Sequence, residues 1–159
     1  MAKIRQKITK SALQTQDFGL RLAKRIPKGT ILALSGDLGG GKTCFTQGLG
    51  KGLGIKQPIL SPSFVITKVF PVNRKGYRNL YHLDLYRLRK AQIDKQSLME
   101  IINDQNSISA IEWAEKIKDW LPQSRTIYLQ FDYLDQERRS LKMKAFSKPL
   151  DKILKLAYN

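Results

Sequence analysis

The sequence predicts one α/β domain over residues 1–159, with a central mixed β-sheet flanked by helices. Two observations lead to this prediction. The apolar, β-branched segment Thr30–Ser35 runs directly into a glycine-rich loop and then a helical pattern, and further strand-like segments follow along the chain. A length of 159 residues is sufficient for one core and too short for two ordinary domains.

The first segments are expected to form a strand, a helix and a second strand. Residues 3–9, KIRQKIT, alternate well enough for a strand, and Ser11 is placed to cap a helix that ends before Pro27. The apolar positions of this helix lie on one broad face: Leu13, Phe18, Leu20 and Leu22. Thr30–Ser35 is apolar on successive positions, as expected of a strand that is covered on both faces.

The loop after this second strand carries a phosphate-binding motif. Residues 36–43, GDLGGGKT, match G-x-x-x-x-G-K-[ST], and apolar residues at helical spacing continue from Thr43 to Gly54. A loop without side chains between a strand and a helix can surround a phosphate with its N–H groups. In this P-loop, Lys42 would bridge the β- and γ-phosphates of a nucleotide, and Thr43 would bind Mg²⁺. The predicted nucleotide-binding residues are Gly36, Asp37, Leu38, Gly39, Gly40, Gly41, Lys42, Thr43 and Cys44.

Cys44 belongs to this set by its position alone. We interpret Cys44 as a small residue that is buried in the helix, and we assign its thiol no chemistry. It is the only cysteine, which excludes an internal disulfide and argues against a metal site built from cysteines.

Two serines follow the predicted P-loop helix. Ser61–Phe64, SPSF, opens the predicted strand Phe64–Phe70, and the turn Val72–Gly76 ends that strand. Taken alone, SPSF is a turn before a strand. In nucleotide switches such a segment can place a hydroxyl near the γ-phosphate, which makes Ser61 and Ser63 candidates.

The segment Tyr77–Leu88 predicts a strand with one polar face. His82 and Asp84 share that face by alternation, and Arg87 follows three residues after Asp84. A histidine, an aspartate and an arginine at the end of a strand could form the edge of an active site. A surface ion pair between Asp84 and Arg87 accounts for two of them equally well, so both interpretations stay open.

The segment Ser107–Glu115 predicts a short strand that ends in carboxylates. In P-loop proteins an acidic residue at the end of a buried strand beside the P-loop strand helps to hold Mg²⁺ and its waters. Glu112 fits this place, although Ser109 interrupts the apolar run and a structural role remains open. Trp113 is interpreted as a packing residue rather than a platform for a base.

The C-terminal third predicts a hairpin and a closing helix. Thr126–Leu134 and Ser140–Phe146 have the pattern of two antiparallel strands around a charged turn. Residues 148–158 predict a helix with Pro149 in its first turn.

Composition restricts the class of protein. The formal net charge is +16 and the pI is near 10.1, which favours polyanionic partners such as RNA, although the basic residues are spread along the chain and part of this charge could be solvated surface. No apolar run approaches the roughly 20 residues that cross a bilayer. The basic N-terminus lacks the apolar segment of a secretory signal. We therefore expect a cytoplasmic protein without membrane contact.

Four segments together resemble the TsaE family, also called YjeE, the bacterial ATPases of tRNA threonylcarbamoyladenosine (t6A) biosynthesis. These segments are GDLGGGKT, SPSF, LYHLDLYRL and IEWAE, in this order. The combination is far more specific than the P-loop, which many unrelated NTPases share. Two positions depart from the family pattern: Ser63 stands where threonine is usual, and residues 97–102, SLMEII, replace a usual Gly-Leu-Glu-Glu run and keep a carboxylate only at Glu100.

The resemblance implies a P-loop fold and a Mg²⁺-dependent ATPase, weak alone and stimulated by partners. It would act with TsaB and TsaD, which transfer a threonylcarbamoyl group to tRNA, and its ATP cycle would reset the complex between turnovers. The positive charge would then meet tRNA, directly or through the complex, or acidic surface on the partners. Carried over to matching positions, Lys42 and the loop amides bind phosphates, and Thr43 and Glu112 organise Mg²⁺. Asp84 acts near the attacking water or in coupling to the partner, and Ser63 senses the γ-phosphate. The predicted catalytic residues are Lys42, Asp84 and Glu112.

Two other function classes use parts of the same pattern. A small-molecule kinase would share the P-loop but needs an acceptor pocket and an arginine-rich lid, for which the basic segment Arg87–Lys95 is short. An RNA-binding module, ATP-dependent or without catalysis, would account for the charge. A non-catalytic module would leave Lys42, Thr43 and Glu112 without a purpose.

Overall fold

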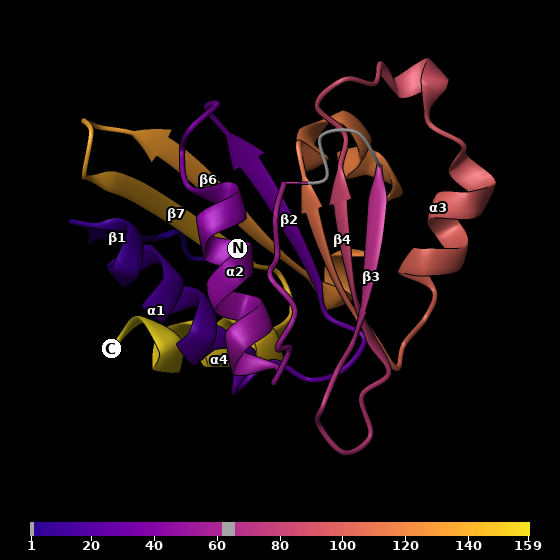
Figure 1. Cartoon of the computed structure of the whole chain (residues 1–159), viewed down its shortest axis with the longest axis horizontal. Coiled ribbons are helices and arrows are strands. Elements are labelled where there is room, and N and C mark those ends of the chain that lie inside the picture. The colour runs from indigo at the N-terminus through magenta and orange to yellow at the C-terminus, as the bar shows by residue number, and fades with distance from the viewer. Residues whose placement is uncertain (1, 62–65) are drawn as a thin grey trace.

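The computed structural model describes residues 2–61 and 66–159, which form a seven-stranded sheet with helices on both of its faces (Figure 1). The strands are β1 (Arg5–Thr9), β2 (Ile31–Gly36), β3 (Thr67–Pro71), β4 (Asn79–Asp84), β5 (Ile108–Glu112), β6 (Thr126–Tyr133) and β7 (Arg139–Ala145). Their order across the sheet is β1-β7-β6-β2-β5-β4-β3. The neighbours β6, β2, β5 and β4 run parallel, and β1, β7 and β3 pair antiparallel with their neighbours. The predicted α/β architecture with a mixed sheet is confirmed.

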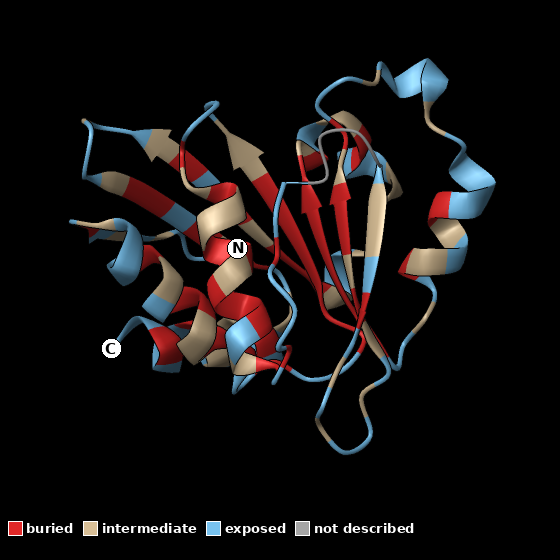
Figure 2. Ribbon diagram, in the orientation of Figure 1, coloured by how far each residue is buried: buried red, intermediate tan, exposed pale blue. Residues whose placement is uncertain are grey.

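Three helices cover one face of the sheet. These are α1 (Ala12–Ala23), α2 (Lys42–Gly52) and α4 (Lys148–Tyr158), and Figure 2 shows buried residues where they meet the strands. The main core lies in this layer. The rings of Phe18, Phe45 and Phe131 pack in series, with centroids 6.0 and 5.6 Å apart, and so join α1 and α2 to β6. This packing fixes the helix that begins at the P-loop against the strands that frame it.

The opposite face is only partly covered. A second core forms where α3 (Lys95–Ile102) and the 3₁₀ helix Ala114–Trp120 lie over β2, β4 and β5. Leu98 of α3 and Ile117 of the 3₁₀ helix are buried there. Neither helix was expected from the sequence. Two further 3₁₀ turns, Lys90–Gln92 and Gln123–Arg125, complete the described elements.

Glycines allow α1 and α2 to pack at very short range. A Cβ built on Gly48 of α2 would lie 1.9 Å from the Gln16 carbonyl oxygen of α1, and one on Gly19 of α1 would lie 2.3 Å from the Phe45 carbonyl oxygen. A real Cβ cannot approach an oxygen so closely. Gly48 weakens α2 as an isolated helix by about 1 kcal/mol relative to alanine, yet it is required for this packing, as is Gly19 of α1.

Most element boundaries agree with the sequence. Ser11 caps α1 as predicted, with its side chain accepting a hydrogen bond from the Gln14 amide, and the C-terminal hairpin and closing helix are both present. The predicted turn Val72–Gly76 connects β3 to β4. Of the predicted strand Phe64–Phe70, residues 64 and 65 lie outside the described residues, and β3 begins at Thr67.

The strand predicted over Ser107–Glu115 is too long at its C-terminal end. β5 ends at Glu112 because Trp113 adopts a left-handed conformation, with φ of 61°, and the chain then enters the 3₁₀ helix. Within the described ranges, no helix combines the length and the apolar character that spanning a membrane requires.

Candidate nucleotide-binding site

A cleft of about 600 Å³ lies where β2, β4 and β5 end and α2 begins. Open sheets with parallel strands bind ligands at this carboxyl edge, and the volume falls within the range of small-molecule sites. The P-loop forms one wall of the cleft, and the ends of β4 and β5 contribute Asp84, Glu112 and Trp113. The β6–β7 turn contributes Glu137, and the start of β7 contributes Arg139.

The P-loop backbone requires glycine at both of its ends. Gly36 has φ of 118°, and a Cβ there would lie 2.0 Å from the Phe131 carbonyl oxygen, so no side chain fits. Gly41, with φ of 101°, is the N-cap of α2, and no side chain caps this helix. The first amides of α2 and the positive end of its dipole are thus open to an anion.

The loop amides divide into two groups. The Asp37 amide donates to the Phe131 carbonyl at 3.1 Å, and the Gly40 amide donates to the Asp37 carbonyl at 2.9 Å. Among the hydrogen bonds of the described residues, none uses the amides of Leu38, Gly39 or Gly41. A Cβ built on Gly39 would have no atom within 4 Å, so the space beside the loop is open. The loop therefore offers free N–H groups next to an open volume, as a phosphate cradle must.

The Lys42 side chain lies back along this loop. Its Nζ donates to the carbonyl oxygens of Gly36 and Asp37 at 2.8 and 2.7 Å, and it stands 4.4 Å from the centre of the Trp113 ring. Burial lowers the pKa of the Lys42 ammonium from its usual value, while the carboxylates of Glu112 and Asp84 oppose this shift. A phosphate in the cradle would supply the negative charge that favours the ammonium form.

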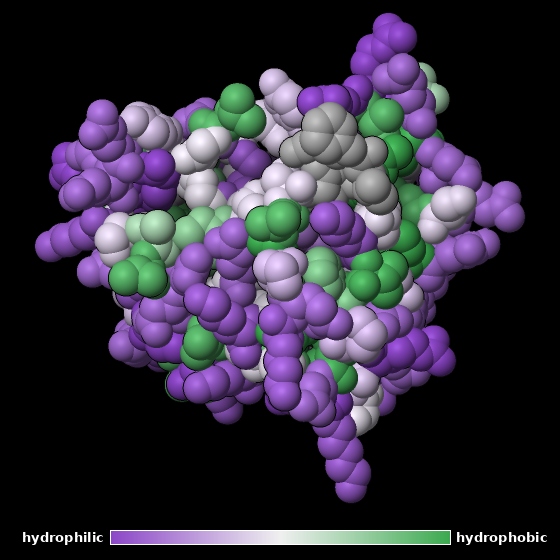
Figure 3. All heavy atoms as spheres, in the orientation of Figure 1, coloured by the Kyte–Doolittle hydropathy of each residue, from purple (hydrophilic) through white to green (hydrophobic). Residues whose placement is uncertain are grey.

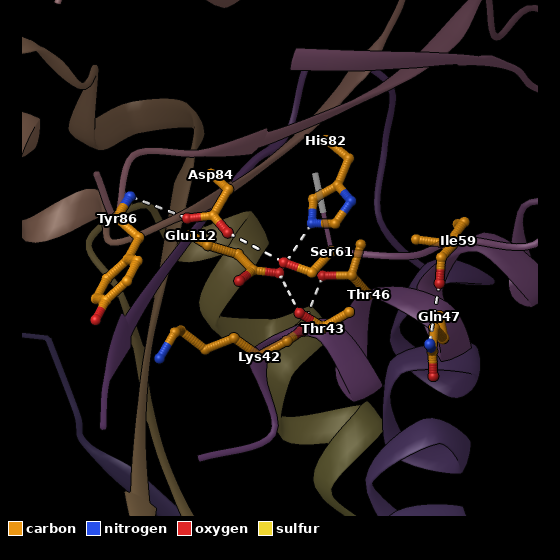
Figure 4. A network of polar contacts seen from close by, with 10 residues as sticks. All are labelled: Lys42, Thr43, Thr46, Gln47, Ile59, Ser61, His82, Asp84, Tyr86 and Glu112. Carbon is orange, nitrogen blue, oxygen red and sulfur yellow. Dashed lines mark hydrogen bonds and ion pairs between the residues drawn. The ribbon is translucent and has the colours of Figure 1, made fainter. Parts of the chain in front are cut away.

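Glu112 is the buried carboxylate of the site. Its Oε1 accepts hydrogen bonds from the Thr43 hydroxyl at 2.8 Å and from His82 Nε2 at 2.9 Å (Figure 4). Glu112 is 3% exposed and His82 0%, so these bonds form away from bulk water. A buried carboxylate is costly unless it is hydrogen-bonded, and the two donors, one from α2 and one from β4, fix its position.

Asp84 stands beside Glu112 at the end of the neighbouring strand. The two residues are partners in the parallel register of β4 and β5, so both carboxylates reach the same edge of the sheet. Asp84 Oδ1 accepts from the Tyr86 amide at 3.0 Å and Oδ2 from the Ser61 hydroxyl at 3.3 Å. Asp84 is half-buried and lines the cleft, which places a second carboxylate within the site.

The oxygen atoms of the site suit Mg²⁺. Thr43 supplies a hydroxyl and Glu112 a carboxylate, the hard oxygen donors that this ion prefers. No group of three or more His, Cys, Asp or Glu side chains gathers as a metal site among the described residues. Mg²⁺ in phosphate-binding sites uses one or two protein oxygens and takes the rest from phosphates and water, so the present donors fit that pattern.

Comparison with known proteins identifies the family. The family model described as "Threonylcarbamoyl adenosine biosynthesis protein TsaE" matches residues 9–141. The chain belongs to the TsaE family.

Individual TsaE proteins agree with this assignment. The chain is 42% identical over 106 residues to a protein of Synechocystis sp. named tRNA threonylcarbamoyladenosine biosynthesis protein TsaE, a match that covers 65% of this chain and 66% of that protein. A Nostoc sp. protein of the same name is 36% identical over 141 residues, covering 84% of this chain and 81% of the relative. The crystal structure of Bacillus subtilis YdiB superimposes with a TM-score of 0.78 at 28% identity, over 99% of this chain and 95% of that one. The P-loop fold expected from the sequence is thereby established.

The structure brings most of the predicted site residues together in one cleft. Leu38, Gly39, Gly40, Gly41, Lys42, Thr43, Cys44, Asp84 and Glu112 line the cleft, and Gly36 and Asp37 form the start of the loop. Ser63 lies outside the described residues. Cys44 is half-buried rather than buried, and burial raises the pKa of its thiol, which keeps it protonated and weakly nucleophilic at neutral pH.

The strand predicted over Tyr77–Leu88 is too long, since β4 ends at Asp84, and its predicted polar face is divided between the core and the cleft. His82 is fully buried, where its ring contacts Glu112 instead of lining the cleft, while Asp84 and Arg87 do line it. The sequence indicated a histidine near the site but not this contact, because the contact depends on the register of β4 against β5.

Two features of the site were not predicted from the sequence, one at Arg139 and one at Trp113. Arg139 of β7 donates to the Gly39 carbonyl at 2.9 Å and brings a second cation to the P-loop. Trp113 packs against the second core as predicted, but its ring also faces Lys42 and Tyr86 in the cleft. The left-handed Trp113 is the only residue other than glycine with positive φ among the described residues. No local pattern in the sequence predicts the contact of Arg139 with the P-loop or the position of the Trp113 ring.

Proposed function

We propose that the chain is a Mg²⁺-dependent ATPase that supports t6A modification of tRNA together with TsaB and TsaD. The observation that carries this proposal is the buried Glu112 carboxylate, which is held by Thr43 and His82 beside the P-loop lysine. Its hydrogen bond with Thr43 places the Glu112 carboxylate beside the hydroxyl that is expected to bind Mg²⁺, which favours a role in metal binding over a purely structural one. The family relationship, with relatives named for t6A biosynthesis, supplies the pathway.

The loop and two cations would bind the polyphosphate of ATP. The free amides of the loop and the N-terminus of α2 provide donors for phosphate oxygens. Lys42 would exchange its two carbonyl partners for phosphate oxygens, because a hydrogen bond between opposite charges is stronger than one to a neutral carbonyl. Arg139, already bonded to Gly39, would add positive charge at the outer side of the loop.

The two carboxylates would have different roles in hydrolysis. Thr43 and Glu112 would hold Mg²⁺, and His82 would keep the Glu112 carboxylate oriented through its hydrogen bond. Bound Mg²⁺ supplies neutralisation of the charge that develops on the phosphates. Asp84, which is less buried, would orient the attacking water or transmit the nucleotide state to the partner. Ser63 would report the γ-phosphate.

ATP turnover would serve the complex rather than make the modification. The TsaE-type subunit would reset TsaB and TsaD between rounds, which predicts weak hydrolysis alone and stimulation by the partners. Modification of tRNA takes place where tRNA is used, so we place the protein in the cytoplasm.

The test is ATP hydrolysis by the purified chain, alone and with purified TsaB and TsaD. We expect stimulation by the partners and at least a tenfold loss in Lys42→Ala, equivalent to about 1.4 kcal/mol of transition-state stabilisation. The matched control is Lys155→Ala, which removes an exposed lysine of α4 that does not line the cleft, and it should keep full activity. Hydrolysis that is undiminished in Lys42→Ala would remove the P-loop from the mechanism.

A further inference from the structure

The end of the molecule opposite the cleft carries a dense group of cations. The helix α2 begins at the P-loop and runs for 11 residues, so its C-terminus lies about 16 Å away from the nucleotide-binding site. The end of α1 and the β3–β4 turn lie at the same end of the molecule (Figure 1). We define the basic end by eight residues: Lys24, Arg25, Lys28, Lys51, Lys56, Arg74, Lys75 and Arg78.

Hydrogen bonds hold these segments together. Arg74 Nη1 donates to the Ala23 carbonyl at 3.0 Å, and the Tyr77 hydroxyl donates to the Ile26 carbonyl at 2.9 Å, which joins the β3–β4 turn to the segment after α1. A Cβ built on Gly54, after α2, would lie 3.1 Å from the Asn73 carbonyl oxygen, so that segment also contacts the turn. The basic end is therefore a preformed surface, and its cations do not depend on a partner to gather them.

Few carboxylates balance this charge. Residues 20–30, 50–57 and 72–79, which contain all eight cations, include no aspartate or glutamate. Asp104 lies 3.8 Å from Arg78 but already accepts hydrogen bonds from Ser107 and Tyr81. Like charges on adjoining segments repel one another, so an anion that binds here relieves the repulsion.

Helix dipoles account for only part of the pattern. Basic residues near the C-termini of helices stabilise them, and Lys24 and Lys51 stand at such positions in α1 and α2. Lys28, Lys56 and Lys75 lie beyond the helices, where this effect has faded, and all three are exposed. Nothing in the proposed ATPase mechanism uses them.

The chemistry of the surface favours phosphates over a protein partner. Protein interfaces rely on large apolar or aromatic anchors that become buried on binding. None of the large hydrophobic side chains that are exposed among the described residues comes from the three segments of the basic end. The side chains over the lower part of Figure 3, where these segments lie, are mostly hydrophilic. Exposed lysines and arginines without such anchors are sufficient to contact a nucleic-acid backbone.

We propose that the basic end binds the phosphate backbone of RNA, and that the natural ligand is the tRNA whose modification the protein supports. The choice of tRNA rests on the proposed function, whereas the charge and shape of the surface do not. Binding at this end leaves the nucleotide cleft free, so the protein can hold RNA and ATP at once.

The test replaces three lysines that have no structural partner. Lys24, Lys56 and Lys75 come from the three segments, are exposed and make no side-chain hydrogen bond or ion pair with the described residues. The triple variant Lys24→Gln, Lys56→Gln, Lys75→Gln should therefore fold normally. The control triple variant Lys148→Gln, Lys152→Gln, Lys155→Gln removes the same charge from exposed positions of α4.

The measurement is the dissociation constant for an unmodified tRNA transcript by fluorescence anisotropy, without ATP or partners, at several NaCl concentrations. Each phosphate contact contributes about 0.7 to 0.9 to the slope of log affinity against log salt, so the basic-end variant should lose roughly 2 to 3 units of slope and bind at least about tenfold more weakly near 0.1 M salt. The control variant should retain most of the wild-type slope.

Two results would overturn the proposal. One is equal loss in the two triple variants, which would show a nonspecific charge effect. The other is wild-type tRNA affinity in the basic-end variant; lost binding of that variant to purified TsaB or TsaD would then assign the surface to a protein. ATP hydrolysis is measured separately, so failure here leaves the ATPase assignment intact, and failure of the ATPase assay does not alter the tRNA measurement.

Discussion

The close packing of α1 on α2 predicts that replacing Gly48 by alanine lowers the stability of the fold, although alanine by itself favours a helix. In Gly48→Ala, the new Cβ would begin 1.9 Å from the Gln16 carbonyl oxygen. An ordinary contact is near 3.5 Å, so the helices must separate locally by about 1.5 Å. Alanine also favours the helical state of α2 by about 1 kcal/mol relative to glycine. Overpacking of this kind costs about 1–3 kcal/mol. We take the upper value because the new Cβ would clash with backbone atoms of Gln16, which cannot rotate away as a side chain can.

The expected net loss of stability in Gly48→Ala is therefore about 2 kcal/mol, which for a domain of this size lowers Tm by about 4–8 °C. Urea and thermal unfolding of the purified variant measure both quantities. Gly50→Ala is the control in the same helix, since the three atoms nearest to the new Cβ all belong to side chains and the only one within 3 Å is the terminal methyl group of Ile59, which can rotate away. Its stability should change by less than about 1 kcal/mol. If Gly48→Ala is instead more stable than wild type, the helices do not require a glycine at this position and the packing argument is wrong.

Two further predictions concern the cleft. Asp84→Ala should bind ATP at least as tightly as wild type, because a carboxylate opposes a polyphosphate, yet it should fail to support repeated rounds of tRNA modification. The t6A formed per complex over several turnovers, with ATP affinity from a fluorescent analogue, tests this; wild-type yield would refute the role of Asp84. Burial lowers the pKa of Lys42, so the ammonium loses its proton at a lower pH than free lysine, and ATP affinity should already fall as the pH approaches the usual lysine range from below. In Lys42→Arg, which stays charged, this alkaline decline should disappear, and an unchanged decline would place the titrating group elsewhere.

The P-loop could be predicted because its signal is local. Glycines, lysine and threonine at fixed spacing between a strand and a helix define the phosphate cradle without reference to the rest of the chain. Asp84 and Glu112 were found for a related reason: each stands at the end of a strand, and parallel strands bring their carboxyl ends to one edge.

The contacts that complete the site come from pairings that no local pattern encodes. His82 meets Glu112 only because of the register of β4 against β5, and Arg139 reaches Gly39 across 100 positions of sequence. The left-handed conformation of Trp113 is unfavourable in isolation and exists because the surrounding packing imposes it. Short helices such as α3 also escape prediction, since eight residues carry too little periodicity to distinguish a helix from a loop.

The central claim is that the buried carboxylate beside the P-loop serves hydrolysis. The most direct measurement compares ATP affinity with ATP turnover in Glu112→Gln, which keeps the shape of the side chain and removes the charge that would steady Mg²⁺. Glu115→Gln makes the same chemical change on an exposed side chain three residues later and is the control. We predict that Glu112→Gln loses turnover by much more than it loses affinity, and that Glu115→Gln changes neither. If affinity and turnover of Glu112→Gln fall together, or if turnover is unchanged, Glu112 is a structural residue and the proposed mechanism is contradicted.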